Sequence, residues 1–404
     1  MSEKKLYACF GGFADQYWTG ISQPDFRGSC DALSLCMVNE ETGKLEIRSQ
    51  LSGLASPSTL VVSRDQKYIY CSNEEVNFGG RGLGGGISAV RLDLEKESME
   101  LINQSSAAGS STCYVALDKT EKYLLVANHG AKFYISRYEI VDGEIKPQVL
   151  REEGCVCLFQ IREDGGIGRI LDRVVLEGTG IDPMEHASAH PHAIIIDEQD
   201  YIIIPNKGGD NIYVGKLNRE TEKIDVLSVY QSDFGSSPRY GAFVEGTDYV
   251  LVQNEYDGHL CSYHLDRESG KLTRISRVDT ADANSDRKGP EGLLDPSLHP
   301  WGCDVQIHPN RRFVYANNTQ RIVRQLELNP ETGELLAKKS YPVEVNLMSR
   351  GIQISPDGRL LIITGMADEK ALVYEIDQMS GELTFLSETP LPTPTALRFL
   401  TLEK

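Results

Sequence analysis

The sequence has no long apolar run, and it is short of positive charge. No stretch of its 404 residues is apolar enough to span a membrane, and the opening segment MSEKKLYACFGGF is too polar for a signal peptide. The chain holds 41 Lys and Arg against 59 Asp and Glu, which gives a formal net charge of −18. Nucleic acids and anionic membrane surfaces bind basic faces. We therefore expect a soluble, cytoplasmic protein that binds neither.

The sequence also lacks a pattern of paired cysteines. Its nine cysteines are odd in number, scattered, and mostly inside apolar runs such as IYCSN and HLCSYHL. This pattern predicts buried thiols in a reducing compartment. Cys155 and Cys157 would point to the same face of a strand, where a disulfide would be strained and a metal would need two further ligands. We interpret both as core residues.

No segment has a sustained helical period, and a repeated β-pattern is present instead. A polar turn precedes an apolar run that ends in a small polar residue, usually Asn: VSRDQKYIYCSN, LDKTEKYLLVAN, IDEQDYIIIPN, VEGTDYVLVQN, IHPNRRFVYANN and ISPDGRLLIITG. A second strand and a Gly turn such as RESGKL or PETGEL follow most copies. Units of this kind predict the four-stranded antiparallel blades of a β-propeller, an all-β fold.

Six copies of the pattern are visible, and the two ends of the chain account for a seventh blade. LYACFGG and LSLCMVNEE near the start lack a repeat strand of their own, and TALRFLTL near the end is a lone strand. We predict that these N- and C-terminal strands share one blade and close a seven-bladed ring, a single domain over residues 1–404. The largest insertions are predicted at residues 11–30, 75–86, 151–189 and 280–300.

Polar side chains at the ends of the repeat strands are the ones that can converge on the mouth of the central channel. The segment EHASAHPHAIIID contains His186, His190 and His192, which could ligate a metal or act as acid/base groups. The segment GSSPRYGAF places Arg239 at a strand entry without nearby acids, which favours contact with an anion. Glu255 ends an apolar strand in VLVQNEYDG and is either a solvated turn residue or a buried group with a shifted pKa.

A second arginine has the same placement as the first. Arg350, in LMSRGIQISPDG, occupies in the last blade the position that Arg239 occupies in its own. Two arginines at equivalent blade positions point towards one axis and suit a carboxylate or phosphate. The sequence has no G-x-S-x-G motif, so it gives no support to a hydrolase with a covalent intermediate.

At these residues the chain resembles the seven-bladed lactonase family, which includes bacterial 6-phosphogluconolactonase and the fungal carboxy-cis,cis-muconate cyclase. The likeness runs over almost the whole chain and is specific in ASPSTLVVSRDQKYIYCSNE, CYVALDKTEKYLLVANHG, HPHAIIIDEQDYIIIPNKGGD, GSSPRYGAF and VQNE. The resemblance implies that His192, Arg239 and Glu255 are catalytic and that no metal or other cofactor takes part. It also implies that Gly208 and Asp210 form a structural turn.

The chain departs from the family pattern at one position. The family tends to have an Arg after the Asn that closes the next repeat, and this sequence has Asn318 there. Either Arg321, Arg324 or Arg350 replaces that Arg, or the substrate is less charged. The further residues expected to bind substrate are His129, His190, Asn318 and Arg350.

The leading hypothesis is an enzyme that hydrolyses a small, anionic, sugar-derived or carboxylated lactone by acid/base chemistry. Arg239 would hold a carboxylate or the ring oxygen, while Glu255 and His192 exchange protons with water or with the carbon beside the carbonyl. Only His192 would then face the cavity, and His190 would order the loop. The alternatives are a muconate-type lactonising cycloisomerase, a carbohydrate isomerase or lyase that uses the three histidines with a divalent metal, and a non-catalytic scaffold for proteins. The sequence leaves the oligomeric state open.

Overall fold

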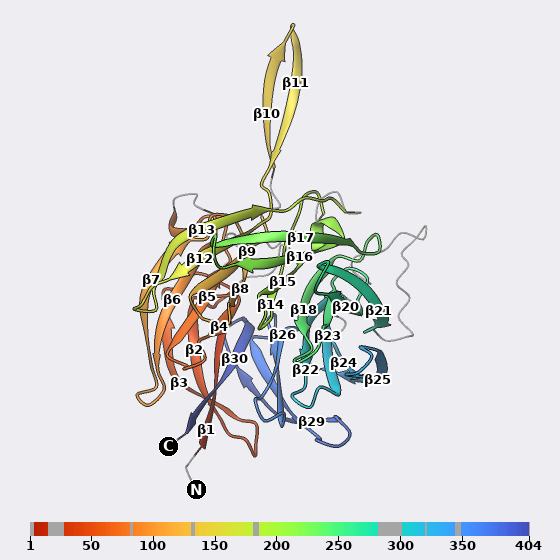
Figure 1. Ribbon diagram of the computed structural model, residues 1–404. Helices are drawn as coiled ribbons and strands as arrows, with labels where there is room; N and C mark the ends of the chain where they lie inside the picture. The colour runs from red at the N-terminus through yellow and green to blue at the C-terminus, as the bar shows by residue number, and fades with distance from the viewer. Residues whose placement is uncertain are drawn as a thin grey trace.

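The computed structural model describes residues 4–14, 28–80, 84–130, 134–180, 186–281, 301–319, 321–343 and 349–403. Within these ranges, the strands form seven four-stranded antiparallel sheets and one separate hairpin. The sheets are arranged as blades around a central axis (Figure 1). This arrangement confirms the predicted seven-bladed β-propeller. In the same ranges, no helix is both long enough and apolar enough to cross a membrane.

Six blades follow one another along the chain, each running from its inner strand to its outer strand. The first three of these contain β4 (Leu60–Val62), β5 (Tyr68–Asn73), β6 (Gly86–Asp93) and β7 (Ser98–Ser106); β8 (Thr112–Leu117), β9 (Tyr123–Asn128), β12 (Cys155–Ile161) and β13 (Ile167–Val175); and β14 (Ile195–Ile196), β15 (Tyr201–Asn206), β16 (Asn211–Asn218) and β17 (Lys223–Gln231). The next three contain β18 (Pro238–Phe243), β19 (Tyr249–Asn254), β20 (His259–Asp266) and β21 (Lys271–Asp279); β22 (Gly302–Ile307), β23 (Phe313–Asn318), β24 (Ile322–Leu328) and β25 (Leu335–Pro342); and β26 (Ser349–Ile354), β27 (Leu360–Gly365), β28 (Lys370–Ile376) and β29 (Leu383–Pro390). Two short 3-10 turns lie in the loops after β5 and β15, η1 (Phe78–Gly80) and η2 (Lys207–Gly209).

The seventh blade joins the two ends of the chain. Its strands are β3 (Leu45–Ser52), β2 (Ala32–Val38), β1 (Lys4–Gly12) and β30 (Pro394–Glu403), in that spatial order. Leu397 lies opposite Phe10, and Glu403 lies opposite Lys4, in an antiparallel pairing of β30 with β1. Figure 1 shows the two strands side by side, in blue and red. The predicted closure of the ring by both ends is confirmed.

The apolar core is divided among the spaces between blades. Seven clusters of buried side chains are found in the described part of the chain, and each joins two neighbouring blades. One of them packs Leu35 against Leu60 and Ile69 of the next blade, and another packs Val323 against Leu361. Because a blade buries both faces only against its neighbours, the stability of the ring is shared by all seven interfaces.

The Gly turns of the repeat lie between the third and fourth strands of a blade and help the blades to pack. Gly270 and Gly333 have φ values of 66° and 74°, a left-handed conformation that an L side chain rarely adopts. A Cβ atom at Gly333 would lie 2.7 Å from Tyr249 of the preceding blade, and one at Gly270 would lie 2.7 Å from Leu227. Glycine therefore serves both the turn and the close approach of the next blade.

One predicted insertion is wrong in its first part, whereas its second part does belong to a long connection between β13 and β14. Residues 151–189 contain β12 and β13, which are the third and fourth strands of an ordinary blade. The insertion precedes them and is the hairpin of β10 (Tyr134–Val141) and β11 (Glu144–Arg151), which projects from the ring in Figure 1. Its alternating pattern imitates the strand pair that follows other repeats, so sequence alone exchanged the two. Within the other predicted insertions, residues 15–27, 81–83 and 282–300 lie outside the described residues.

Candidate active site at the channel mouth

The inner strands of the blades begin in a common register. In four blades the residue pairs that start the inner strand and end the second strand are Thr112–Asn128, Pro238–Asn254, Gly302–Asn318 and Ser349–Gly365. In a fifth blade the bridge between Pro191 and Asn206 takes the same place, ahead of the short inner strand β14. The next residue along each inner strand therefore takes an equivalent place around the channel mouth. In the other two blades these places belong to Ser58 and Thr395, and Thr395 Oγ1 donates a hydrogen bond to the Ser58 carbonyl (2.8 Å). The mouth ring, as we call it, consists of Ser58, Cys113, His192, Arg239, Cys303, Arg350 and Thr395.

A second set of side chains follows the Asn that ends the second strand. In each case the backbone N–H of the residue after this Asn donates to a carbonyl of the loop that leads into the inner strand. The donor and acceptor residues are Glu74 and Ser56, His129 and Ser111, Lys207 and His190, Glu255 and Ser237, and Thr319 and Trp301, at 2.7–3.1 Å. We call Glu74, His129, Lys207, Glu255 and Thr319 the second ring. Their shared backbone contact brings them next to the mouth ring.

Glu255 is held between two buried cations. Its Oε2 forms an ion pair with Arg239 Nε at 2.6 Å, and its Oε1 accepts a hydrogen bond from Lys207 Nζ at 2.6 Å. The three side chains are only 6–10% exposed. Of the two possibilities for Glu255, the structure thus supports the buried group rather than the solvated turn residue. Moving any one of the three side chains away would leave a buried charge without its partner, which is strongly unfavourable. The three groups therefore hold one another in place.

Arg239 is oriented by contacts on three sides. Besides Glu255, its Nη1 donates to the Cys303 carbonyl at 2.6 Å, and its guanidinium carbon lies 4.7 Å from the centre of the Tyr240 ring. Burial opposes the charge of Arg239, but the Glu255 carboxylate, together with Tyr240, Cys303 and Asp304, outweighs burial, and the pKa of the guanidinium is raised. The arginine is therefore permanently charged. The carboxylate of Glu255 follows the second strand of the same blade, β19. The carbonyl of Cys303 belongs to β22, the inner strand of the next blade.

The predicted structural turn positions this arginine. Asp210 is buried in a left-handed conformation (φ 50°), and its carboxylate accepts backbone N–H groups from Gly235 (2.8 Å) and Ser237 (2.7 Å). Both donors belong to the GSSP segment that leads into Arg239. At Gly208 a Cβ atom would lie 1.9 Å from the Ser188 carbonyl, so the turn has no space for a side chain.

His192 is a buried, neutral member of the mouth ring. Its ring centre lies 5.4 Å from the Tyr240 ring, so His192 and Arg239 contact the same aromatic side chain. Burial, and then the positive charge of Arg239, lower the pKa of His192 well below the usual value of 6.5. Its Nδ1 is buried and has no hydrogen-bond partner among the described residues. A neutral imidazole in this setting offers a lone pair to a proton donor.

The other histidines make separate contacts. His190 Nδ1 lies 2.6 Å from the His129 carbonyl, and the two rings stack at 4.2 Å. His186 Nε2 lies 3.2 Å from Ser237 Oγ. The structure therefore brings His129 and His190 together beside His192, while His186 supports the loop before Arg239. Within the described ranges, no three His, Cys, Asp or Glu side chains are grouped as metal ligands.

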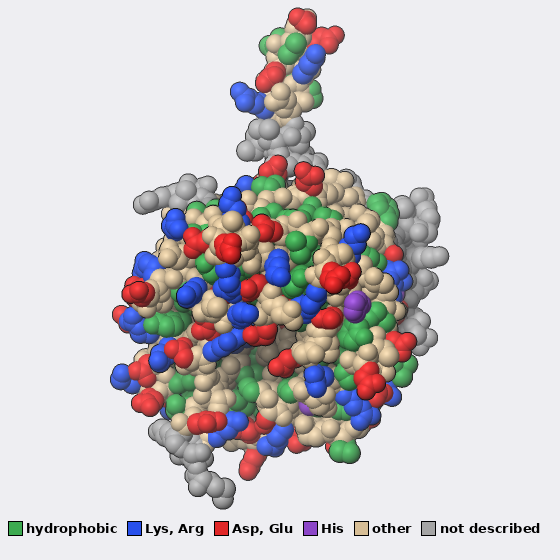
Figure 2. Space-filling model, viewed as in Figure 1, with side chains coloured by type: hydrophobic (Ala, Val, Ile, Leu, Met, Phe, Trp, Pro, Cys, Tyr) green, Lys and Arg blue, Asp and Glu red, His purple; other side chains and the backbone are tan. Residues whose placement is uncertain are grey.

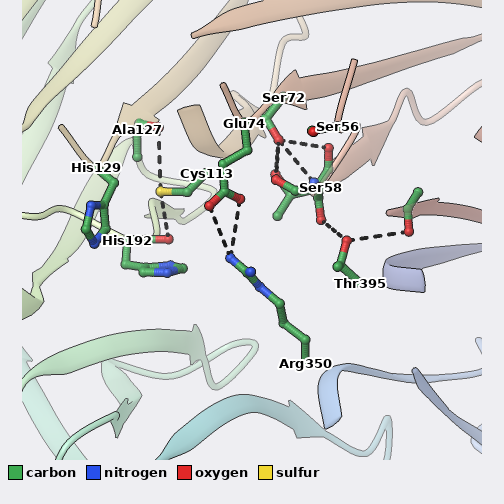
Figure 3. A network of polar contacts seen from close by, with 12 residues as sticks. Ser56, Ser58, Ser72, Glu74, Cys113, Ala127, His129, His192, Arg350 and Thr395 are labelled. Carbon is green, nitrogen blue, oxygen red and sulfur yellow. Dashed lines mark hydrogen bonds and ion pairs between the residues drawn. The ribbon is translucent and has the colours of Figure 1, made fainter. Parts of the chain in front are cut away.

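Arg350 enters the mouth ring from the blade that precedes the closing blade. Its Nη2 lies 3.3 Å from Glu74 Oε2, and its guanidinium carbon lies 4.3 Å from the centre of the Phe13 ring. Figure 3 shows Arg350 extended towards Glu74, with Cys113, His129 and His192 to the left of this ion pair. The second arginine is thus also paired with a second-ring carboxylate, at a longer distance than Arg239.

Asn318 has a different place from the one that the family pattern assigned. Its Nδ2 donates to the Thr280 carbonyl (2.9 Å), as Nδ2 of Asn73 donates to Ala55 and that of Asn128 to Ala107. Asn318 is therefore the repeat Asn itself, which ties one blade to the next. The position after it, where the family has Arg, belongs to Thr319. From the sequence alone, Asn317 is assigned as the repeat Asn and Asn318 as the residue after it. This alignment is wrong by one residue because two asparagines are adjacent.

The two thiols of the mouth ring are not reactive nucleophiles. Burial raises the pKa of Cys113 and raises that of Cys303 to about 11. Only a thiolate is a strong nucleophile, so both groups stay in the unreactive form near neutral pH. All nine cysteines are buried and free.

A cavity of about 410 Å³ occupies the channel beyond the mouth ring. Its wall includes Tyr114, Tyr240 and Asp304, which directly follow members of the ring, and none of the three predicted catalytic residues lines it. Figure 2 shows the molecule hollowed near its centre, with acidic and basic side chains around the hollow. Burial raises the pKa of Asp304 to about 6. The candidate site is therefore the ring with its ion pairs, and the channel cavity adjoins it at Thr395, which belongs to the ring and lines the cavity.

Two site residues escaped the sequence analysis. Lys207 and Glu74 both follow the Asn of a repeat, as do the predicted residues His129 and Glu255. The available signal was positional: a charged residue directly after the repeat Asn. Aligning the repeats on that Asn would have selected all four at once.

Comparisons with known proteins agree with this architecture. A family model described as "Lactonase, 7-bladed beta-propeller" matches residues 19–399. A 6-phosphogluconolactonase of Formosa agariphila is 23% identical over 389 residues, covering 94% of each chain, and one of Bacillus subtilis is 23% identical over 379 residues, covering 93% of this chain and 96% of its own. Among solved structures, the periplasmic gluconolactonase of Pseudomonas aeruginosa has the same fold, with a TM-score of 0.78 at 18% identity over 98% of this chain and 99% of its own.

Proposed function

The chain belongs to the lactonase family of seven-bladed β-propellers, and we propose that it hydrolyses a sugar-derived or carboxylated lactone at the channel mouth. The observation that carries the proposal is the buried chain of Lys207, Glu255 and Arg239 beside a neutral His192. This set supplies fixed positive charge and a proton acceptor, the two requirements for attack of water on a lactone carbonyl. The relatives named 6-phosphogluconolactonase support the same class of reaction.

In the proposed reaction the cations stabilise the charge that forms on the carbonyl oxygen. The buried guanidinium of Arg239 is held by Glu255 and by the Cys303 carbonyl, so it does not need to reorganise as the charge develops. Lys207 is fixed by the same carboxylate. Arg350, with its longer contact to Glu74, is the arginine more easily diverted to a carboxylate or phosphate of the substrate.

His192 is the proposed proton carrier. The oxygen of a water molecule bonds to the carbonyl carbon of the lactone, and the water gives a proton to the imidazole of His192. The lactone carbon thereby becomes tetrahedral. When the bond between that carbon and the ring oxygen breaks, the leaving alkoxide takes the proton back from His192. The product is the open-chain hydroxy acid, which loses its own proton to solvent. Glu255 orients the two cations, and the buried thiols take no part.

The proposed substrate is a small lactone, with a cytoplasmic place of action. Nine free cysteines support a reducing compartment. No cofactor is required by the proposed steps, because each proton and electron pair moves between the lactone, water and His192.

The proposal is tested with a panel of lactones. Glucono-δ-lactone, 6-phosphoglucono-δ-lactone and a muconolactone are offered to the wild-type protein and to Glu255→Gln, and acid release is followed above the spontaneous rate. We expect hydrolysis of at least one sugar lactone and a loss of roughly 10²-fold in kcat/KM for the variant, since both cations lose their carboxylate. The matched control is Glu220→Gln, an exposed carboxylate in the turn between β16 and β17.

Two outcomes would overturn the proposal. One is a wild-type protein that hydrolyses none of the lactones faster than water does. The other is a folded Glu255→Gln variant with the wild-type rate, because the ion-pair chain would then be a structural feature only.

A further inference from the structure

The inserted hairpin has an apolar face that none of the other described strands covers. Tyr138 lies opposite Pro147, and Ile140 lies opposite Ile145, so these four side chains share one face. Tyr138, Ile140 and Ile145 are 67%, 78% and 70% exposed. Neither strand of the hairpin pairs with a strand of the ring in the described structure, and Figure 1 shows the hairpin standing clear of the blades. An isolated two-stranded hairpin is only marginally stable in water.

A further strand can pair with the free edge of β10 more readily than with the free edge of β11. Pro147 lies on β11 and has no N–H to donate to an added strand. On β11 the antiparallel register centred on Lys146 would also place like charges opposite one another. The edge of β10 carries neither obstacle between Ser136 and Ile140. An added strand therefore fits β10.

The sequence of β10 is complementary to itself in one antiparallel register. If two copies pair about a two-fold axis at Tyr138, Arg137 of each copy lies opposite the partner's Glu139, and two ion pairs form. Registers centred on Arg137 or on Glu139 would instead place like charges opposite one another. Charge thus selects a single register out of the neighbouring ones.

Hydrogen bonding favours the same register. The two-residue turn of Asp142 and Gly143 has φ values of 56° and 80°, as in a type I′ turn. Pro147, which cannot donate, lies opposite Tyr138, so this pair is of the non-hydrogen-bonded kind. The N–H and C=O groups of Tyr138 then point away from β11. In pairing centred on Tyr138, these N–H and C=O groups form hydrogen bonds with Tyr138 of the second copy. Arg137 and the partner's Glu139 then form a non-hydrogen-bonded pair, the kind in which the side chains lie closer together.

From these observations we propose that the protein is a homodimer joined through β10, with the two hairpins forming one four-stranded antiparallel sheet. The contact is isologous, as in most two-fold dimers. Four strands with a shared apolar face meet the requirement for a stable sheet that two strands do not. Tyr138 would pack beside the partner's Tyr138 on that face. The net charge of −18 opposes non-specific association, so the contact depends on the local match.

Charge reversal with exchange of partners tests the proposal. Sedimentation velocity over a wide range of protein concentration should give a mass near twice 44.8 kDa for the wild-type protein. Arg137→Glu alone and Glu139→Arg alone should each weaken the dimer by about tenfold or more, because two attractive pairs become repulsive. The double variant, with both charges exchanged, should dimerise like the wild type. An equimolar mixture of the two single variants should form a mixed dimer.

The control is Glu144→Lys, a charge reversal of the same size on β11, which should leave the dimer unchanged. Thermal unfolding followed by circular dichroism checks that all variants are folded. A wild-type protein that stays monomeric overturns the proposal. A dimer that survives both single reversals, or a double variant that stays monomeric, overturns it as well, because the contact then lies elsewhere or does not use this register.

Discussion

The charge state of His192 follows from its surroundings and has a measurable consequence. Burial and the nearby Arg239 lower the pKa of its imidazole well below 6.5. The neutral form, which accepts the proton, is therefore fully populated at pH 6.5 and above and is lost only at more acidic pH. We expect kcat/KM for lactone hydrolysis, corrected for the spontaneous reaction, to stay constant from pH 8 down to pH 6.5. A decline with its midpoint near 6.5, the value of an ordinary histidine, would contradict the proposed role.

Substitution of His192 separates acid/base chemistry from metal chemistry. Nδ1 of His190 and Nε2 of His186 lie against the His129 carbonyl and Ser237 Oγ, and among the described residues no three His, Cys, Asp or Glu side chains are grouped as metal ligands. We expect His192→Ala to lower kcat by roughly 10²-fold or more, the usual range for a lost acid/base group. A chelator should leave the wild-type rate unchanged. Loss of activity in the chelator, with recovery on adding zinc or manganese, would favour a metal-dependent reaction instead.

Asp304 in the channel wall couples stability to pH. Burial raises its pKa from 3.8 to about 6 in the folded protein. A carboxyl group with a raised pKa contributes stability that is fully present below its unfolded value and is lost as the pH rises through the folded value. The unfolding free energy of the wild type, relative to Asp304→Asn, should therefore fall by about 2 kcal/mol between pH 4 and pH 8. Denaturant unfolding at several pH values measures this difference, and a constant difference would count against the raised pKa.

At the residue scale the sequence identified the chemistry but not the partners. Arg239 and His192 could be selected because they lie where inner strands begin, and Glu255 could be selected because it directly follows an apolar repeat strand. Lys207 carried only a positional signal, its place after Asn206. Its ion pair with Glu255 could not be predicted, because the pair spans two blades and depends on the register of both. Asn318 shows the same limit, since only its hydrogen bond to Thr280 reveals which of two adjacent asparagines belongs to the repeat.

At the scale of elements, the loop before β18 fixes the position of Arg239. Asp210 accepts the N–H groups of Gly235 and Ser237, and it holds the segment from a neighbouring blade. We expect Asp210→Ala to lower kcat about tenfold or more with a smaller change in KM, because a displaced guanidinium stabilises the transition state less well. Asp225→Ala, at an exposed position on β17, is the control. Equal loss in both variants, or no loss in Asp210→Ala, would contradict a positioning role.

Strand pairs were recognised from sequence more reliably than their assignment to blades. The sequence placed Cys155 and Cys157 on a strand but assigned residues 151–189 to an insertion. In the structure residues 134–151 form the separate hairpin β10–β11, and residues 155–175 form the blade strands β12 and β13. What distinguishes them is burial: Cys155, Cys157 and Leu158 are buried between blades, whereas Tyr138 and Ile140 are exposed. Alternation specifies a strand but not the surface that covers it, so the insertion could not be located.

At the scale of the whole molecule, the ring should tolerate closure at a different blade. Lys4 and Glu403 are cross-strand partners, so a short linker can join the two ends of the chain. New ends can be opened at Met379, an 82% exposed residue in the turn between β28 and β29. In this permutant one blade again combines three strands from one end with one strand from the other, as the native closing blade does. We expect lactone hydrolysis at the wild-type rate and a Tm only a few degrees lower, since all seven interfaces between blades are retained.

Deletion of residues 394–404 is the contrasting variant. It removes an inner strand with the buried Leu397 and Leu400, so cooperative unfolding should be lost. A permutant that fails to fold would show that closure by β1 and β30 is a requirement of this ring rather than one of several equivalent solutions.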